Sequence, residues 1–309
     1  MQAAIVFVHL GPRLPTYLRD ALAQARAFNR CPILLIAHRA TATEFPIDPV
    51  LDVEVVDYES LEKSEQHARF TRAAPLDRSF RDGFWTYTSE RFFCLESLLQ
   101  RRSFDAVVHL ESDNLIYVDL DEILPVLVRR YPGLAAPFDN DWRCVPGFVF
   151  LRNLPAIAAL TAFFNTALES RILPQPNDML LCGAFHSVYG ASAIGRLPIV
   201  TPDYPAPLRS LTGQIPAAPK DYSQFVTELG SIFDAAAFGQ FLGGIDPRNS
   251  DGRDTIGFIN ENCIFDPSRY AIEWTRDGAG RRVPFAGLSG ARYRINNLHI
   301  HSKELARFR

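Results

Sequence analysis

Two carboxylates, Glu111 and Asp113, flank one serine directly after the mostly apolar run 106–110. An apolar run of this kind is typical of a strand buried in a parallel sheet, and such sheets bind ligands at the carboxyl ends of their strands. Carboxylates there are costly unless a cation compensates them, and hard divalent cations prefer oxygen ligands. The pattern therefore predicts a metal site. The alternative is a serine or Asx turn that caps the next segment, because two acidic residues around one small residue are not specific alone.

A second group of chemistry-bearing side chains stands near the end of the sequence, in residues 298–303 (Leu-His-Ile-His-Ser-Lys). Alternate residues of a strand share a face, so His299 and His301 are expected on the same side. Imidazoles are common metal ligands, and the ammonium of Lys303 supplies a point charge for a phosphate. The segment predicts a metal and phosphate site, with a solvated surface strand as the alternative.

Together, the acidic pair and the C-terminal histidines resemble the nucleotide-sugar glycosyltransferases of the GT-A fold. The resemblance implies that Asp113 is the principal ligand of a divalent cation, Mn²⁺ or Mg²⁺, which bridges the diphosphate of a nucleoside-diphosphate sugar. It also implies that His299 or His301 supplies the second protein ligand to the metal. Lys303 would then reach the diphosphate, and Glu111 would lie beside the bound donor.

Further segments fit the same resemblance. The loop that contains His9 and Gly11, after the first predicted strand, resembles the loop that receives the nucleotide base. Arg91, in the helix before the acidic pair, stands where the family often places a basic residue on the donor phosphate. Residues 147–153 resemble the strand that closes the acceptor side of the site.

The resemblance also implies a catalytic carboxylate, Asp178, at the start of a predicted helix. It would act as a general base on the acceptor hydroxyl, with a helix N-terminus keeping its pKa low. The competing structural role is that of an N-cap. Asn177 precedes it where a Glu is usual, so inverting and retaining mechanisms both stay open. Asp139, Asp141 and Asp246 are further candidates for an acceptor-side carboxylate.

These residues need a framework that brings distant parts of the chain together. Alternating strands and helices predict an α/β fold with a doubly wound, mostly parallel sheet flanked by helices, as in the GT-A fold. The predicted strands are 3–8, 33–36, 53–56, 106–110, 135–138, 147–151 and 199–200, and the predicted helices are 15–29, 86–101, 120–130, 155–168, 178–189 and 234–242. Residues 60–82 are expected to form a loop with a short helix.

The composition of the sequence changes after residue 204, where Pro, Gly and Ser become frequent. We expect residues 1–204 to form a core that binds the metal and the nucleotide sugar. Residues 205–309 are expected to form a loop-rich region that completes the site and ends in a strand over 293–301.

The composition of the 309-residue chain is that of an ordinary globular protein, with 47% hydrophobic and 22% charged residues. A net charge of -3 without a basic stripe argues against a nucleic-acid partner. The sequence has no apolar run of about eighteen residues and no signal-peptide pattern, which predicts a cytoplasmic protein without a transmembrane segment. The five cysteines form no Cys-x-x-Cys pair, so we expect buried free thiols rather than a zinc site. The excess of Arg over Lys is typical of a GC-rich, bacterial genome.

The sequence therefore predicts a metal-dependent glycosyltransferase, resembling hexosyltransferases, that moves a sugar to the hydroxyl of a glycan or another acceptor. A sugar nucleotidyltransferase is an alternative, but its Gly-rich basic loop is missing, because residues 10–15 are short and Pro-rich. A non-catalytic nucleotide- or sugar-binding module is a second alternative, since Glu-Ser-Asp departs from the usual Asp-x-Asp. The sequence shows neither the Gly-rich dinucleotide-binding pattern nor a serine nucleophile elbow.

Overall fold

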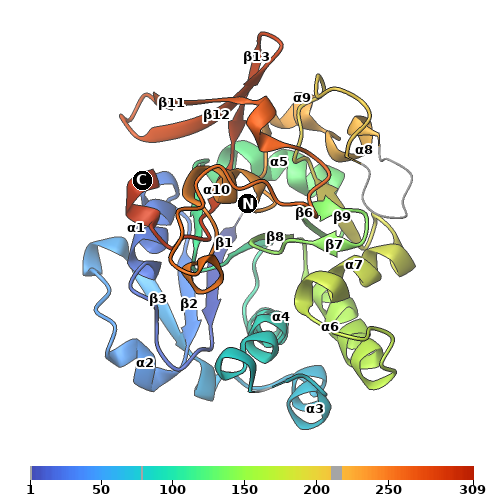
Figure 1. Ribbon diagram of the computed structural model, residues 1–309. Coiled ribbons are helices and arrows are strands. Elements are labelled where there is room, and N and C mark those ends of the chain that lie inside the picture. Colours follow the sequence, from blue (N-terminus) through green and yellow to red (C-terminus); the bar gives the residue numbers. More distant parts are fainter. Residues whose placement is uncertain (1, 78, 210–217) are drawn as a thin grey trace.

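One large sheet forms the centre of the molecule (Figure 1). The computed structural model describes residues 2–77, 79–209 and 218–309. The sheet runs in the order β3 (Val53–Asp57), β2 (Ile33–Ala37), β1 (Ala3–His9), β4 (Ala106–Leu110), β8 (Phe148–Leu151), β6 (Leu134–Asn140) and β7 (Arg143–Cys144), with β9 (Ile194–Leu197) beside β6. The strands from β3 to β4 are parallel, as are β6 and β9, whereas β8 is antiparallel to β4 and β6. The predicted α/β class is confirmed.

Helices flank this sheet, and α3, α4 and α6 gather below it in Figure 1. The longer helices are α1 (Leu18–Phe28), α3 (Glu65–Ala73), α4 (Phe84–Arg101), α5 (Leu120–Arg130), α6 (Leu154–Glu169) and α7 (Asp178–Tyr189). The shorter ones are α2 (Arg39–Thr43), α8 (Pro219–Tyr222), α9 (Val226–Leu229), α10 (Ala237–Gly243) and α11 (Pro247–Ser250). In the described part of the chain, no helix combines the length and the apolar character that crossing a bilayer requires.

The central strands are buried on both faces. Every residue of β2 and β4 is buried, as is β1 up to Val8. Successive residues of a strand point to opposite faces, so continuous apolar runs are what a sheet covered on both sides needs. Because β1 and β4 are parallel neighbours, the segments that follow them emerge at the same edge. The sheet thereby places His9 beside the Glu111–Asp113 turn.

A second, two-stranded sheet brings the C-terminus to that turn. β5 (Asn114–Ile116) follows the turn directly and pairs antiparallel with β14 (Asn297–His299), so that His299 lies opposite Asn114. One residue further along, the backbone N–H of Ile300 donates to the carbonyl of Asp113 over 2.9 Å. This pairing, and not proximity in sequence, joins the acidic pair to the C-terminal histidines.

The buried carboxylate of Asp234 holds β14 against α10. Its oxygens accept hydrogen bonds from the backbone N–H groups of Phe238 and Gly239, at 2.9 Å each, and of His299 at 3.0 Å. The close approach needs a glycine at position 239, because a Cβ there would collide with the carbonyl group of His299. The backbone position of His299 is therefore set by one side chain and one glycine.

The C-terminal region contains more regular structure than expected. β10 (Ser231–Ile232), β13 (Ala291–Ile295), β12 (Arg282–Leu288) and β11 (Ala271–Arg276) form a four-stranded sheet in that order, at the top of Figure 1. The predicted strand 293–301 is wrong in its extent, because β13 ends at Ile295 and β14 starts at Asn297 in a different sheet. The strand predicted at 199–200 is also misplaced, since the strand in this part of the chain is β9. The division at residue 204 stays a prediction.

We predict that Asp234→Ala lowers the free energy of unfolding by roughly 2–4 kcal/mol, because it leaves buried N–H donors without an acceptor. Asp234→Asn keeps one acceptor oxygen and should cost less. Urea unfolding measures both, with Asp121→Ala as the control, since Asp121 is exposed. A loss for Asp234→Ala as small as that of the control would contradict the role given to this carboxylate.

Candidate metal centre

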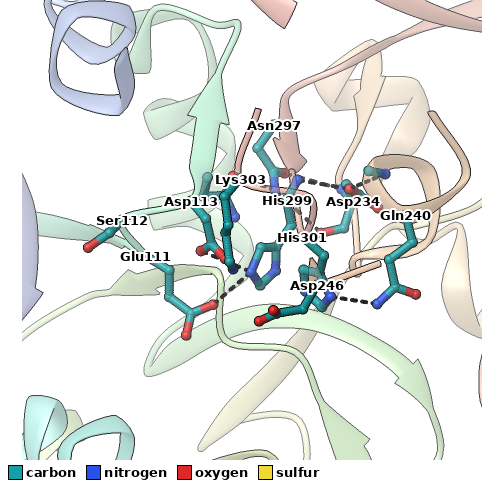
Figure 2. A network of polar contacts seen from close by, with 12 residues as sticks. Glu111, Ser112, Asp113, Asp234, Gln240, Asp246, Asn297, His299, His301 and Lys303 are labelled. Atoms are coloured by element: carbon teal, nitrogen blue, oxygen red, sulfur yellow. Dashed lines mark hydrogen bonds and ion pairs between the residues drawn. The ribbon is translucent and has the colours of Figure 1, made fainter. Parts of the chain in front are cut away.

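Three potential metal ligands converge where β4 ends and β14 passes (Figure 2). Nε2 of His299 lies 3.1 Å from Oε2 of Glu111 and 3.1 Å from Oδ1 of Asp113. One ligand atom from each of the three residues lies within 4.8 Å of the others. In the described part of the chain this is the one such group of three His, Cys, Asp or Glu residues. We call Glu111, Asp113 and His299 the triad.

Two basic side chains compensate the charge of the triad. Lys303 forms an ion pair with Asp113 through the carboxylate oxygen that does not face His299. Arg91, which is nearly buried in α4, pairs with Glu111 from the other side. The backbone of Lys303 adopts a left-handed conformation (φ 66°), which is uncommon for a residue with a side chain. Each carboxylate therefore has its own cation, and His299 bridges the two.

These contacts decide the charge state of the triad. Burial by itself opposes ionisation, but Lys303 and His299 outweigh it and hold the pKa of Asp113 well below its usual range. Burial also tends to raise the pKa of Glu111, but Arg91 and His299 outweigh it, and the pKa is lowered. Burial works against the charged form of His299, yet Asp113 and Glu111 raise its pKa. The structure thus stabilises two ionised carboxylates at one point.

The donor set fits a divalent cation. Two carboxylates and one imidazole whose ligand atoms lie within 4.8 Å of one another suit Mn²⁺, which accepts both oxygen and nitrogen ligands, and Mg²⁺, which favours oxygen. The site also leaves two buried nitrogens without hydrogen-bond partners among the described residues, Nδ1 of His299 and Nδ2 of Asn114. The triad would hold such a cation through one oxygen of each carboxylate and Nε2 of His299.

Gly147, at the start of the β8 segment, makes room for the imidazole of His299. A Cβ at this position would lie 2.7 Å from Nδ1 of His299 and 2.6 Å from Nδ2 of Asn114. The carbonyl of Gly147 also accepts the backbone N–H of Glu111 at 3.0 Å. A side chain at position 147 would therefore displace a triad residue.

Arg91 connects the triad to Asp178, the candidate catalytic carboxylate. One arm of its guanidinium pairs with Glu111 and the other with Asp178, so the two carboxylates share one buried cation. Asp178 is the first residue of α7, and the N-cap is Asn177, whose side chain accepts from the N–H of Leu180 at 3.0 Å. The alternative role of Asp178 as an N-cap is therefore wrong. The expected low pKa is wrong as well, because burial raises the pKa of Asp178 and Arg91 offsets this only in part.

The loop after β1 meets the acidic turn. Nδ1 of His9 lies 3.2 Å from the hydroxyl of Ser112, and Nε2 lies 3.0 Å from the carbonyl of Arg13. Burial lowers the pKa of His9 despite that contact with Arg13. A Cβ at Gly11 would lie 2.9 Å from Nε2 of His9. The structure places His9 and Gly11 together beside the triad turn.

His301 lies next to the triad but outside it. Its ring packs edge-on against that of His299, with centroids 4.4 Å apart, and Nδ1 contacts Nε2 of Gln240 at 2.7 Å. Burial, His299 and Lys303 lower the pKa of His301 to about 3. The ring faces the helix α10 through Nδ1.

The other candidate acceptor-side carboxylates are engaged elsewhere. Asp139 binds Arg143 through both oxygens, and Asp141 accepts from the hydroxyl of Tyr222 at 2.7 Å. Asp246 is the N-cap of α11, although Figure 2 shows it beside His301.

Several residues that shape the site were missed by the sequence analysis. They are Asn114, Gly147, Asp234, Gly239 and Gln240. The glycines were visible in the sequence, but only the packing shows what a Cβ would strike. Asp234 looked like a helix start, and its bond to His299 crosses 65 residues of sequence.

The chain matches no known family model and no curated protein. Solved structures similar to it include mouse xyloside xylosyltransferase 1 in its apo form, with a TM-score of 0.43 and 11% identity over 63% of this chain and 84% of that one. The galactosyltransferase LgtC with donor and acceptor sugar analogues has a TM-score of 0.42 and 12% identity over 63% and 73%. The glycosyltransferase GlyE of Streptococcus pneumoniae TIGR4 has a TM-score of 0.39 and 12% identity over 63% and 44%. At this level of similarity, function has to be argued from the site itself.

We predict that Gly147→Ala weakens Mn²⁺ binding by about 10- to 100-fold, the range typical for residues that orient a metal ligand. The added methyl group would push the imidazole of His299 away from the two carboxylates. Titration of the nucleotide-free protein with Mn²⁺, followed by electron paramagnetic resonance, measures the affinity. Gly278→Ala is the matched control, because a Cβ at Gly278 meets nothing within 4 Å. Equal affinities in the two variants would contradict the packing argument.

Proposed function

We propose that the protein is a metal-dependent glycosyltransferase that moves a sugar from a nucleoside-diphosphate sugar to an acceptor hydroxyl. The observation that carries the proposal is the convergence of Glu111, Asp113, His299 and Lys303 at the carboxyl end of β4. It joins the two segments that resemble GT-A glycosyltransferases, which stand 186 positions apart at Asp113 and His299 (299 − 113). Two carboxylates, an imidazole and a lysine together suit a metal-bound diphosphate.

The triad would hold Mn²⁺ or Mg²⁺, which when bound supplies Lewis-acid stabilisation of the charge on a leaving diphosphate. Lys303 would exchange its carboxylate partner for a phosphate oxygen, because its ammonium already lies at the edge of the triad. A lysine in this position neutralises the leaving group as its charge grows. His9 and Gly11, beside the triad turn, would contact the nucleotide base.

Arg91 has a different proposed role from the phosphate contact that the resemblance implies. Both of its terminal nitrogens pair with carboxylates, and its Nε is buried without a partner among the described residues. The side chain is 5% exposed. We therefore assign to Arg91 the positioning of Glu111 and Asp178 relative to each other.

Asp178 is the candidate general base. Its raised pKa makes the carboxylate a stronger proton acceptor than an ordinary aspartate, provided that it remains ionised beside Arg91. In an inverting reaction it would take the proton of the acceptor hydroxyl as the new glycosidic bond forms. If Asp178 does not reach the acceptor, the retaining outcome is favoured. The anomeric configuration of the product, read by NMR, decides between the two.

We predict that Asp113→Ala abolishes Mn²⁺-dependent binding of nucleoside diphosphates and leaves the fold intact. The variant removes the carboxylate on which His299 and Lys303 both converge. Thermal shift with UDP, GDP, ADP and CDP, each with and without Mn²⁺, reports binding, since a ligand of the folded state raises the melting temperature. Asp121→Ala is the control, because Asp121 is exposed. Metal-dependent stabilisation that survives in folded Asp113→Ala would refute the assignment.

The same protein preparation separates the alternative functions. A glycosyltransferase hydrolyses or transfers a nucleotide sugar in the presence of Mn²⁺. A sugar nucleotidyltransferase requires a nucleoside triphosphate and a sugar phosphate, and a binding module turns over neither.

We predict that Asp178→Asn lowers the rate of transfer by about 100- to 10,000-fold with little change in donor affinity, as expected when a positioned general base is removed. Asn is close to Asp in size, its amide oxygen can still accept from Arg91, and the Asn177 cap of α7 is kept, so the variant should fold, which circular dichroism checks. Transfer rates and donor affinity are measured with the nucleotide sugar that the hydrolysis assay identifies. Normal transfer by the variant would rule out this residue as the base.

A further inference from the structure

The contact between Gln240 and His301 determines what His301 offers to a ligand. Nε2 of the Gln240 side chain lies 2.7 Å from Nδ1 of His301, as Figure 2 shows. An amide nitrogen only donates hydrogen bonds. Nδ1 of His301 must then accept, so it carries a lone pair and no proton.

The orientation of the Gln240 amide is supported by its surroundings. Gln240 is 7% exposed, and its Oε1 is buried without a partner among the described residues. The opposite orientation would put the amide nitrogen there, with both of its N–H donors unpaired. Buried donors without a partner are rarer in proteins than carbonyl oxygens without one. The observed orientation leaves one donor and one oxygen unpaired, which costs less.

An imidazole whose Nδ1 accepts a hydrogen bond has no proton on that nitrogen, so its one ring proton is on Nε2. In His301 this N–H points away from α10, since the two ring nitrogens lie on different sides of the ring. No described residue accepts a hydrogen bond from it, and Nε2 is not among the buried nitrogens that lack a partner. Nε2 is therefore accessible, and the ring that carries it packs against that of His299 in the triad.

We propose that His301 is not a metal ligand but a hydrogen-bond donor that binds an anionic oxygen of the donor's diphosphate through Nε2–H. This proposal rests on the proposed function, and it makes His301 a substrate-contacting residue and Gln240 the positioning residue that sets its tautomer. A nitrogen that carries a proton cannot coordinate a cation. A donor N–H next to His299 and Lys303 instead extends the cationic edge of the site, which suits a phosphate oxygen.

The tautomer of His301 is measured directly by two-dimensional ¹⁵N–¹H NMR on protein with labelled histidine, without any ligand. We expect the wild type to show the Nε2–H form at His301. In Gln240→Met, which has a similar length and no amide, both forms should appear. A wild-type spectrum with the proton on Nδ1, or an unchanged tautomer in Gln240→Met, would overturn the proposal.

Binding experiments separate a donor from a metal ligand. In His301→Leu, the affinity of the nucleotide-free protein for Mn²⁺ should be unchanged. The affinity for the best of UDP, GDP, ADP and CDP, with Mn²⁺ present, should fall about 10- to 100-fold, as for a lost hydrogen bond to a charged group. His301→Gln, which keeps an N–H near the position of Nε2, should lose less. A loss of Mn²⁺ affinity in His301→Leu, or unchanged nucleotide affinity in both variants, would overturn the proposal.

The outcomes also distinguish this proposal from the proposed function. If the wild type binds none of the four nucleotides with Mn²⁺, the proposed function fails and the diphosphate role of His301 fails with it. If the wild type binds them and both His301 variants bind them with the same affinity, the proposed function stands and the role of His301 is refuted.

Discussion

Two carboxylates of like charge at the end of one strand, one half-buried and one buried, are the constraint on which the rest of this structure depends. Glu111 and Asp113 lie in a turn where their ionised forms cost free energy unless cations face them. The protein supplies those cations from separate elements: Arg91 from α4, and His299 and Lys303 from the C-terminal segment. The same excess of oxygen ligands is what a divalent cation would exploit.

Strand pairing and close backbone packing hold the C-terminal segment in place. β14 is a three-residue strand bonded to β5, too short to be stable alone. Asp234 adds a carboxylate that binds the backbone of His299 and of α10. Glycines at 147 and 239 remove the methyl groups that would separate these segments. The position of the His299 imidazole thus depends on backbone contacts outside the triad.

Arg91 connects the triad to Asp178. Its guanidinium neutralises Glu111 on the side of the triad and Asp178 on the side of α7. In a buried setting, such a shared cation favours the ionised form of both carboxylates, at the cost of its own desolvation. A substitution that removes the charge of Glu111 would therefore change the electrostatic surroundings of Asp178. Asp178 is thereby linked to the triad through Arg91 and Glu111.

The sequence by itself determined the α/β class, the main strands and helices, and the residue types that meet in the triad, because apolar periodicity and chemically distinctive side chains are local signals. It did not reveal the β11–β12–β13 sheet, the Asn177 cap or the raised pKa of Asp178, which contradicted the expectation drawn from a helix N-terminus. Only the tertiary structure decided which histidine joins the triad: His299 faces the carboxylates and His301 faces Gln240. Strand alternation predicts that both histidines lie on one face and cannot distinguish them. Burial, non-local hydrogen bonds and the space left by a missing Cβ distinguish them, and these are properties of the packed chain.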